Sequence, residues 1–291
     1  MTESTAPSYQ RSHSTGLVWR QSRPAPDELA PALAEQYDSL AVESPVALEY
    51  NGISHSALLA SPDNLDDLAY GFSFTEGIIR HADDILDVQL QEGEHGYLLQ
   101  ITIANACMHQ LKARRRQLAG RTGCGLCGLE SLDEVRRDLP AVRPPQHAPT
   151  TQAIFHALDQ MRDKQALHLL TGATHAAAWC SLAGEVLIVR EDVGRHNALD
   201  KLYGHLLRHH IDLQQGMVLI SSRASFEMVQ KTAAMGIAFL VAVSAPTSFA
   251  LQLAQELGVM LAAFARHSGF TLYSHPHYLQ RDTPLSLPST V

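Results

Sequence analysis

The second half of the chain alternates between short apolar runs, typical of strands, and longer segments with apolar residues at helical spacing. This alternation most constrains the fold, because strands separated by helices form a layered α/β domain with helices on the faces of the sheet. The predicted strands are 167–171, 176–182, 185–190, 217–221, 238–244, 260–264 and 270–274, and the predicted helices are 151–163, 196–209, 226–235 and 248–257.

The first half has a different pattern, which is rich in strands. Two strand-like runs, 46–50 and 53–59, flank an Asn-Gly dipeptide, the strongest short-range signal for a hairpin. Apolar residues at near-helical spacing over 64–79 predict one helix, and 88–90 with 97–103 predict a second hairpin. The predicted fold class is therefore α/β, or α+β overall, with a smaller β-rich domain before a larger layered one.

Shifts in composition divide the chain further. Residues 1–40 mix Ser, Thr, Gln and Pro with little periodicity and predict a flexible N-terminal arm. Residues 140–150 are proline-rich, and proline cannot continue a helix, so we expect a linker there. The other predicted units are a β-rich domain at 41–139, an α/β cofactor-binding domain at 151–275 and a tail at 276–291.

The segment GRTGCGLCG at 120–128 presents two thiols, Cys124 and Cys127, on a glycine-rich loop. The thiolate is the form that acts as nucleophile and metal ligand, and nearby cations and helix N-termini favour it. Arginines at 114–116 and Arg121 precede the pair, and a capping-box pattern after it predicts a helix over 132–139. A reactive thiol pair, half of a zinc site and a purely structural pair all fit this pattern.

A zinc site meets specific objections. A four-thiolate site would need Cys107 and Cys180, which lie in apolar, strand-like contexts where cysteine usually serves as a small core residue. The zinc deaminase signature requires His-x-Glu ahead of Pro-Cys-x-x-Cys, and no His-x-Glu occurs upstream here. We therefore assign no metal ligands.

Charge and cysteine content limit the partners and the compartment. The formal net charge of -8 argues against general nucleic-acid binding, which requires a positive surface. The start of the chain lacks a basic stretch followed by an apolar run, and no window reaches the roughly 18 apolar residues of a spanning helix, so we expect no membrane association. Four cysteines with one Cys-x-x-Cys pair indicate a reducing compartment, the cytoplasm.

Three polar junctions follow or precede predicted strands, at 169–175, 189–197 and 220–225. In layered α/β domains ligands bind beyond the carboxyl ends of strands, and arginines beside helix N-termini suit a phosphate. The alternative is that these residues only cap helices and form surface ion pairs. The candidate ligand-binding residues are Thr171, Gly172, Thr174, His175, Asp192, Arg195, His196, Ser222, Arg223 and Lys231.

Several longer motifs occur in order between residues 44 and 273. They are EYNG, LAYGFSFTEGII, GRTGCGLCG, LLTGATHAAA, VREDVGRHNALDK, SSRASFEMVQK and VSAPTS. In these motifs the chain resembles the FdhD family of formate dehydrogenase accessory proteins. One departure is Ala173, where family members commonly have glycine.

The resemblance implies a cytosolic homodimer whose second domain is similar to the cytidine deaminase fold without its zinc site. The implied activity is that of a sulfurtransferase, which accepts persulfide sulfur from a cysteine desulfurase and passes it to the molybdenum or tungsten of a bis(molybdopterin guanine dinucleotide) cofactor needed by formate dehydrogenase. Cys124 would carry the persulfide and Cys127 would assist. The cofactor-binding segment would comprise Phe264, Ala265, Arg266, His267, Ser268 and Gly269. GDP would mimic part of this cargo.

A second function stays open at this point. The protein could bind and deliver the molybdenum cofactor as a chaperone and use its thiols only as ligands. Formation of a persulfide on Cys124 separates the two functions, because a chaperone needs no such adduct.

Overall fold

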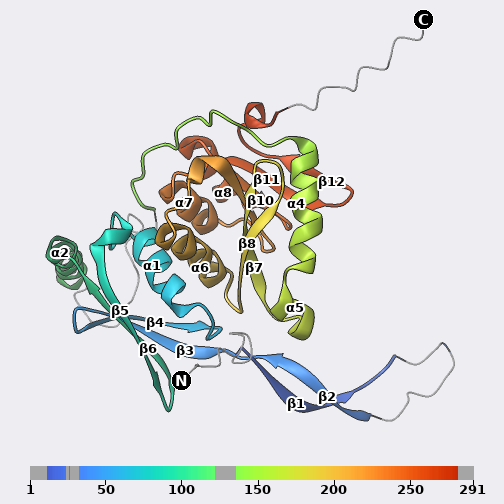
Figure 1. Cartoon of the computed structure of the whole chain (residues 1–291), viewed down its shortest axis with the longest axis horizontal. Helices are drawn as coiled ribbons and strands as arrows, with labels where there is room; N and C mark the ends of the chain where they lie inside the picture. The colour runs from blue at the N-terminus through green and yellow to red at the C-terminus, as the bar shows by residue number, and fades with distance from the viewer. Residues whose placement is uncertain (1–11, 24–25, 27–32, 122–135, 281–291) are drawn as a thin grey trace, which may run out of the picture.

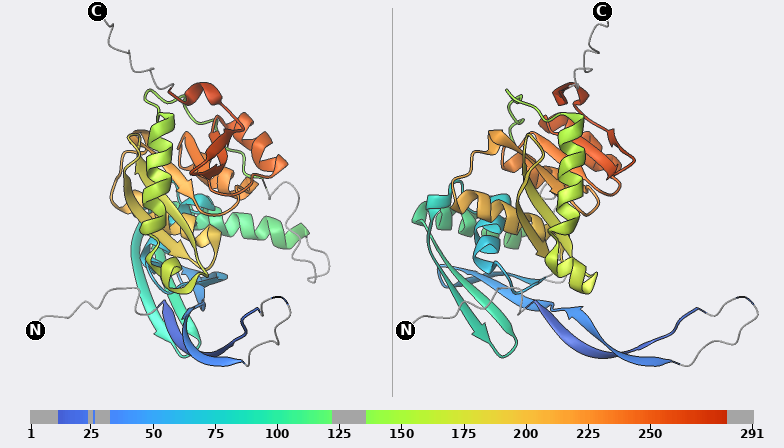
Figure 2. Two further views of the ribbon diagram at one scale, coloured as in Figure 1. Left: turned by 90° about the vertical axis from the view of Figure 1, so that its right-hand side faces the viewer. Right: turned by 45° about the vertical axis from the view of Figure 1, so that its right-hand side comes forward.

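The computed structural model describes residues 12–23, 26, 33–121 and 136–280. Cys124 and Cys127 lie outside these ranges. The described chain forms a six-stranded sheet, a four-stranded sheet and a two-stranded ribbon. The six-stranded sheet, with helices on both faces, forms the larger part of the molecule, and the four-stranded sheet lies beside it (Figures 1 and 2).

The six-stranded sheet has the order β12-β11-β10-β9-β7-β8. Strands β9, β10 and β11 are parallel, whereas β7 pairs antiparallel with both β8 and β9, and β12 pairs antiparallel with β11. The strands are β7 (His175–Ser181), β8 (Val186–Asp192), β9 (Gly216–Ile220), β10 (Phe239–Ala242), β11 (Met260–Arg266) and β12 (Gly269–Leu272). Every strand predicted from 176 onward is confirmed.

Helices cover both faces of this sheet (Figure 1). One face carries α6 (Arg195–Arg208), α7 (Phe226–Ala234) and α8 (Ser248–Leu257), and the other carries α4 (Thr151–Asp163). The hydroxyls of Thr150 and Thr247 cap α4 and α8 by accepting the amides of Ala153 and Ala250. All four helices are those predicted from the spacing of apolar residues.

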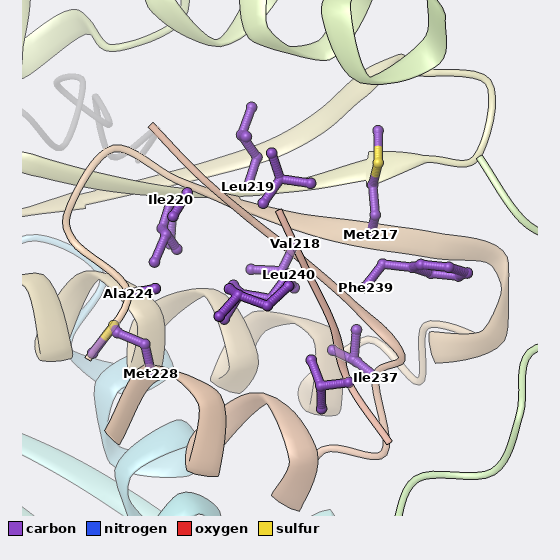
Figure 3. Packing of buried hydrophobic residues seen from close by; sticks show 14 of the residues in the cluster. Met217, Val218, Leu219, Ile220, Ala224, Met228, Ile237, Phe239 and Leu240 are labelled. Carbon is purple, nitrogen blue, oxygen red and sulfur yellow. The ribbon is translucent and has the colours of Figure 1, made fainter. Parts of the chain in front are cut away.

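The core of this domain is centred on β9, all of whose residues are buried. Figure 3 shows Met217 to Ile220 packed with Phe239 and Leu240 of β10 and with Met228 of α7. A continuous apolar run without alternation is expected for a strand covered on both faces. The layered α/β architecture predicted from the sequence is confirmed. The likeness to cytidine deaminases stays a prediction.

The N-terminal unit contains the four-stranded sheet, in the order β4-β3-β6-β5. Its elements are β3 (Ser44–Tyr50), β4 (Ile53–Ala60), α1 (Leu65–Thr75), β5 (Ile85–Gly93), β6 (Gly96–Ile103) and α2 (Asn105–Arg121). Asn51 and Gly52 have φ of 48° and 79°, as a tight hairpin turn requires. Both predicted hairpins and the predicted helix α1 are confirmed. Short 3-10 turns lie at Ala82–Asp84, Leu213–Gln215 and Pro276–Tyr278.

The predicted strand at 167–171 is wrong, because this run forms helix α5 (Ala166–Thr171). The carboxylate of Glu191 accepts the amides of Leu167 and His168 at the start of the helix, at 2.8 Å each. Gly172, with φ of 66°, ends it in the left-handed conformation. A short apolar run does not distinguish a strand from a helix by its periodicity, so contacts from β8 decide the outcome.

Two more segments differ from expectation. Within the predicted arm, β1 (His13–Arg20) and β2 (Ala34–Ala41) pair antiparallel and form the ribbon that projects from the body (Figure 1). Residues 136–139, predicted as the end of a helix, have no helical structure. Arg137 there donates its backbone amide to Gln230 Oε1 and a guanidinium N–H to the carbonyl of Thr75. These tertiary contacts replace the hydrogen bonds of a helix.

Helices α1 and α6 join the two units by packing closely at two glycines, Gly71 and Gly204. A Cβ added at Gly71 would lie 1.7 Å from the carbonyl oxygen of Asp200, and one added at Gly204 would lie 1.7 Å from that of Asp67. Only glycine allows the two backbones to approach so closely.

A charged cluster lies at one end of the same contact. The carboxylate of Asp67 on α1 accepts Arg190 Nε at 2.9 Å and Arg208 Nη1 at 2.5 Å. Arg190 Nη2 lies 2.7 Å from His205 Nδ1. Burial, together with the charge of Arg190, lowers the pKa of His205 to about 4. His205 is therefore neutral near pH 7 and can accept the hydrogen bond from Arg190.

This low pKa predicts a loss of stability in mild acid. In the unfolded chain His205 takes up a proton below about pH 6.5, whereas the folded protein resists protonation until the pH falls to about 4. Because the unfolded state binds more protons between these values, the free energy of unfolding should fall as the pH falls through this window. Urea titrations from pH 7 to pH 4 should show a smaller decline in His205→Gln than in the wild type. The surface variant His95→Gln should follow the wild type, and an equal decline in all three proteins would contradict this role of His205.

Candidate functional site

The sheet brings the polar junctions predicted from the sequence to one edge. Strands β8, β9, β10 and β11 run in the same direction, and β7, which lies between β8 and β9, runs in the opposite direction. The carboxyl ends of β8, β9, β10 and β11 therefore lie at the same edge of the sheet. The start of β7 also lies there, because His175 pairs with Asp192 at the end of β8. The three junctions and the 264–269 segment therefore surround one region.

A pocket of about 690 Å³ opens at this edge, between α4, α5 and the strand ends. Six residues predicted to bind ligand line it: Gly172, Thr174, His175, Ala265, Arg266 and His267. Its apolar lining consists of Leu158, Met161, Ala173, Val243 and Ala265, and its basic or imidazole lining consists of Arg162, His168, His175, Arg266 and His267. Among the described residues that line it there is no carboxylate. A flat apolar ring and an anionic group would both find matching surfaces.

His175 lies in a positive environment. Burial lowers its pKa, and the charges of Arg195 and then His168 lower it further. The ring is therefore poor at holding a proton. An anion bound nearby would offset these charges and favour the protonated form.

Arg195 is the first residue of α6, and its Nε is buried without a hydrogen-bond partner in the described part of the chain. The preceding residue, Gly194, provides no side-chain cap for the helix. Free amides at a helix start and an unpaired guanidinium nitrogen are groups that bind phosphate or carboxylate. Arg195 is therefore the clearest anion-binding residue at this edge.

His196 and Glu227 connect the starts of α6 and α7. His196 Nε2 lies 2.5 Å from Glu227 Oε2, and this contact is the main reason that the pKa of Glu227 is lowered. Arg223 is exposed on the loop before α7, whereas the neighbouring Ser222 is buried and donates to the carbonyl of Arg223. Both residues lie at the strand ends without lining the pocket.

The remaining predicted residues have other surroundings. Thr171 donates to the carbonyl of Leu167 within α5. Phe264 is exposed at 44%, Ser268 lies in the turn between β11 and β12, and Gly269 is the first residue of β12. His267, at the mouth of the pocket, pairs with Asp159 at 2.7 Å.

Two predicted residues, Asp192 and Lys231, are buried away from the pocket. Lys231 Nζ donates to Thr75 Oγ1, Glu76 Oε1 and both carboxylate oxygens of Asp200, at 2.8 to 3.0 Å. The carboxylate of Asp192 pairs with Lys201 at 2.6 Å. These groups are occupied by protein partners in this structure.

Some pocket residues had no signal in the sequence. Leu158, Met161 and Arg162 belong to α4, which follows the predicted linker and shows only an ordinary amphipathic pattern. His168 lines the pocket because residues 166–171 form helix α5 and not the predicted strand. Its Nδ1 lies 2.9 Å from the carbonyl oxygen of Thr174. Glu191 supports this wall by also accepting Thr174 Oγ1 at 3.1 Å.

The other two cysteines cannot both join one metal site. Cys107 lies in the core of the N-terminal unit, and Cys180 lies in the core around β9. Burial raises the pKa of Cys180 to about 12. No group of three His, Cys, Asp or Glu side chains among residues with described positions could hold a metal ion. In the same residues no helix is both long and apolar enough to cross a membrane.

Comparisons with known proteins agree along the length of the chain. Residues 41–280 match the model of the FdhD/NarQ family. A protein of Bordetella petrii named Sulfur carrier protein FdhD is 55% identical over 247 residues, covering 85% of this chain and 88% of its own length. A protein of Cupriavidus necator with the same name is 51% identical over 249 residues and covers 86% of each chain.

A solved structure also matches. The crystal structure of a formate dehydrogenase accessory protein from Desulfotalea psychrophila superposes with a TM-score of 0.68, covering 91% of this chain and 99% of that one. The sequence identity is 20%, so this match concerns the fold.

Proposed function

The chain belongs to the FdhD/NarQ family, and from that premise we propose that it is a sulfur carrier that serves formate dehydrogenase. One observation carries the proposal. A glycine-flanked thiol pair, Cys124 and Cys127, occurs in the same chain as a strand-end pocket whose described lining is basic and free of carboxylates. Such a protein can hold sulfur on one segment and an anionic acceptor on another.

The proposed chemistry is sulfur transfer between thiols and then to a metal cofactor. The Cys124 thiolate attacks the outer sulfur of a persulfide on a cysteine desulfurase, so one S–S bond forms as the donor's S–S bond breaks and the donor leaves as a thiolate. Attack by Cys127 on the inner sulfur of Cys124 can then release HS⁻ and form a Cys124–Cys127 disulfide. In that release the two thiols supply the two electrons that reduce the carried sulfur.

The proposed acceptor is the molybdenum or tungsten of a bis(molybdopterin guanine dinucleotide), bound as cargo in the strand-end pocket. The apolar lining around Met161 and Val243 suits a flat ring, and His175 and Arg266 in the lining suit phosphates. Arg195 does not line the pocket, but its charge acts on His175, so it can add a phosphate contact beside the pocket. The cysteine chemistry requires a reducing compartment, so we also propose a cytoplasmic location. A homodimer remains an expectation from the family resemblance.

The described chain on the C-terminal side of the cysteine segment supports this assignment. Arg137 follows the segment and donates its backbone amide to Gln230 of α7 at 2.8 Å. One turn earlier on α7, Glu227 contacts His196 at the strand ends. The segment therefore rejoins the fold close to the strand-end junctions.

Replacing Arg195 with glutamine should weaken binding of GDP, used here as a fragment of the cargo. Losing a charge-assisted contact to phosphate should reduce the affinity about tenfold, and Arg223→Ala, at an exposed position, should have a smaller effect. Isothermal titration calorimetry measures both. Arg20→Gln on the projecting ribbon is the control and should bind GDP as the wild type does. Unchanged affinity in both site variants would remove these arginines from the site.

A further inference from the structure

A buried ion pair lies directly behind the strand-end site. Asp192 ends β8, Lys201 lies on α6, and their charged atoms are 2.6 Å apart with both side chains fully buried. The proposed function assigns this pair no role. Burying two charges is costly unless both are well paired and hydrogen-bonded, so the partners of the pair indicate its purpose.

Both carboxylate oxygens of Asp192 are bound by protein groups, so neither is free to accept a hydrogen bond from a ligand. Its Oδ1 accepts the amide of Gly194 at 2.8 Å and Asn197 Nδ2 at 3.1 Å. Its Oδ2 accepts the amide of Ser61 at 3.0 Å in addition to the contact with Lys201. The carboxylate thus binds Gly194, which precedes Arg195, and Asn197, which follows it. It also binds Ser61 of the N-terminal unit.

Further contacts fasten the same turn to the N-terminal unit. Lys201 Nζ donates to the carbonyl of Ser61, and Asn197 Nδ2 donates to that of Leu59, both at 2.8 Å. The amide of Val193 donates to Ser61 Oγ at 3.2 Å. The start of α6 is therefore held on both sides of Arg195, at Gly194 and at Asn197.

Resting on the proposed function, we propose that Asp192, Lys201 and Asn197 are positioning residues, which hold the start of α6 so that Arg195 and the free helix amides face the bound anion. Lys201 also neutralises Asp192, whose negative charge would otherwise oppose an anion at the strand ends. Because Lys201 cancels its charge, the carboxylate of Asp192 can hold this turn in place without repelling an anion bound beside it. Through Ser61, the N-terminal unit contributes to the geometry of the site.

The test is a double-mutant cycle with GDP as the probe. Asn197→Ala removes two donated hydrogen bonds but leaves the ion pair, and it should reduce GDP affinity about fivefold to tenfold in the wild-type background. In an Arg195→Gln background the same change should cost less than about twofold, because its effect passes through Arg195. Calorimetry measures all four proteins.

Asp192→Asn leaves Lys201 buried without its counter-ion and is expected either to fail to fold or to bind GDP more weakly than Asn197→Ala. Tyr50→Phe is a matched control, because it loses a buried hydrogen bond of 2.7 Å to Ser73 in the N-terminal unit and should keep wild-type affinity. The inference is overturned if Asn197→Ala has the same fold effect in both backgrounds, if it has none, or if folded Asp192→Asn binds normally. A wild-type protein that binds no GDP would instead overturn the proposed ligand, and the inference with it.

Discussion

Serine in place of Cys124 is expected to abolish activation of formate dehydrogenase, lowering it about a hundredfold or more, because a hydroxyl is neither ionised nor strongly nucleophilic at neutral pH. The assay is formate-dependent dye reduction in cells that lack their own family member and express this chain. Folding and GDP affinity should be unchanged, because serine has nearly the same shape as cysteine and the proposed phosphate-binding residues, Arg195, His175 and Arg266, lie in other segments.

Cys107→Ala is the control for loss of a thiol. Cys107 is buried in the N-terminal unit, where burial raises its pKa, so it has little thiolate character. This variant should support activation as the wild type does. Activation by Cys124→Ser at the wild-type level would show that sulfur does not pass through position 124.

Valine at Gly71 or Gly204 should strongly destabilise the protein. Its Cβ would overlap a backbone carbonyl of the facing helix, and a backbone cannot move aside as a flexible side chain can. Separating α1 from α6 would also disturb the charged cluster around Asp67. We expect a loss of about 3 kcal/mol in the free energy of unfolding, and a fall of roughly 6–12 °C in the melting midpoint.

Gly93→Ala is the matched control, because a Cβ there would lie an ordinary 3.6 Å from the carbonyl oxygen of Gly96. Its melting midpoint should lie close to that of the wild type. If Gly71→Val and Gly204→Val also melt with the wild type, the two units do not depend on this helix contact for their stability.

Local sequence patterns predicted most of the fold because most elements here follow local rules. The buried strand β9 is a continuous apolar run, the Asn51-Gly52 turn has the residues its geometry requires, and α4 and α8 begin at capping threonines. The rule that ligands bind beyond strand ends also pointed to residues that share a pocket, since His175 and Arg266 both line it.

The parts that differ depend on contacts distant in the sequence. Helix α5 forms where Glu191 of β8 accepts its first amides, and no local pattern reveals that partner. The ribbon of β1 and β2 depends on pairing across residues 21–33, which the irregular composition of the arm conceals. Lys231 was a candidate phosphate ligand because it lies on the helix that follows β9. In the structure its ammonium group instead forms ion pairs with Asp200 and Glu76.

The most direct test of the central claim is mass spectrometry of the protein after incubation with a cysteine desulfurase and cysteine. Cleavage after Arg121 and Arg136 releases one peptide that contains both Cys124 and Cys127. We expect this peptide to gain the mass of one sulfur atom, about 32 Da, and fragmentation to place it on Cys124, the persulfide-bearing thiolate. An unmodified peptide, or sulfur found only on Cys107 or Cys180, would contradict it.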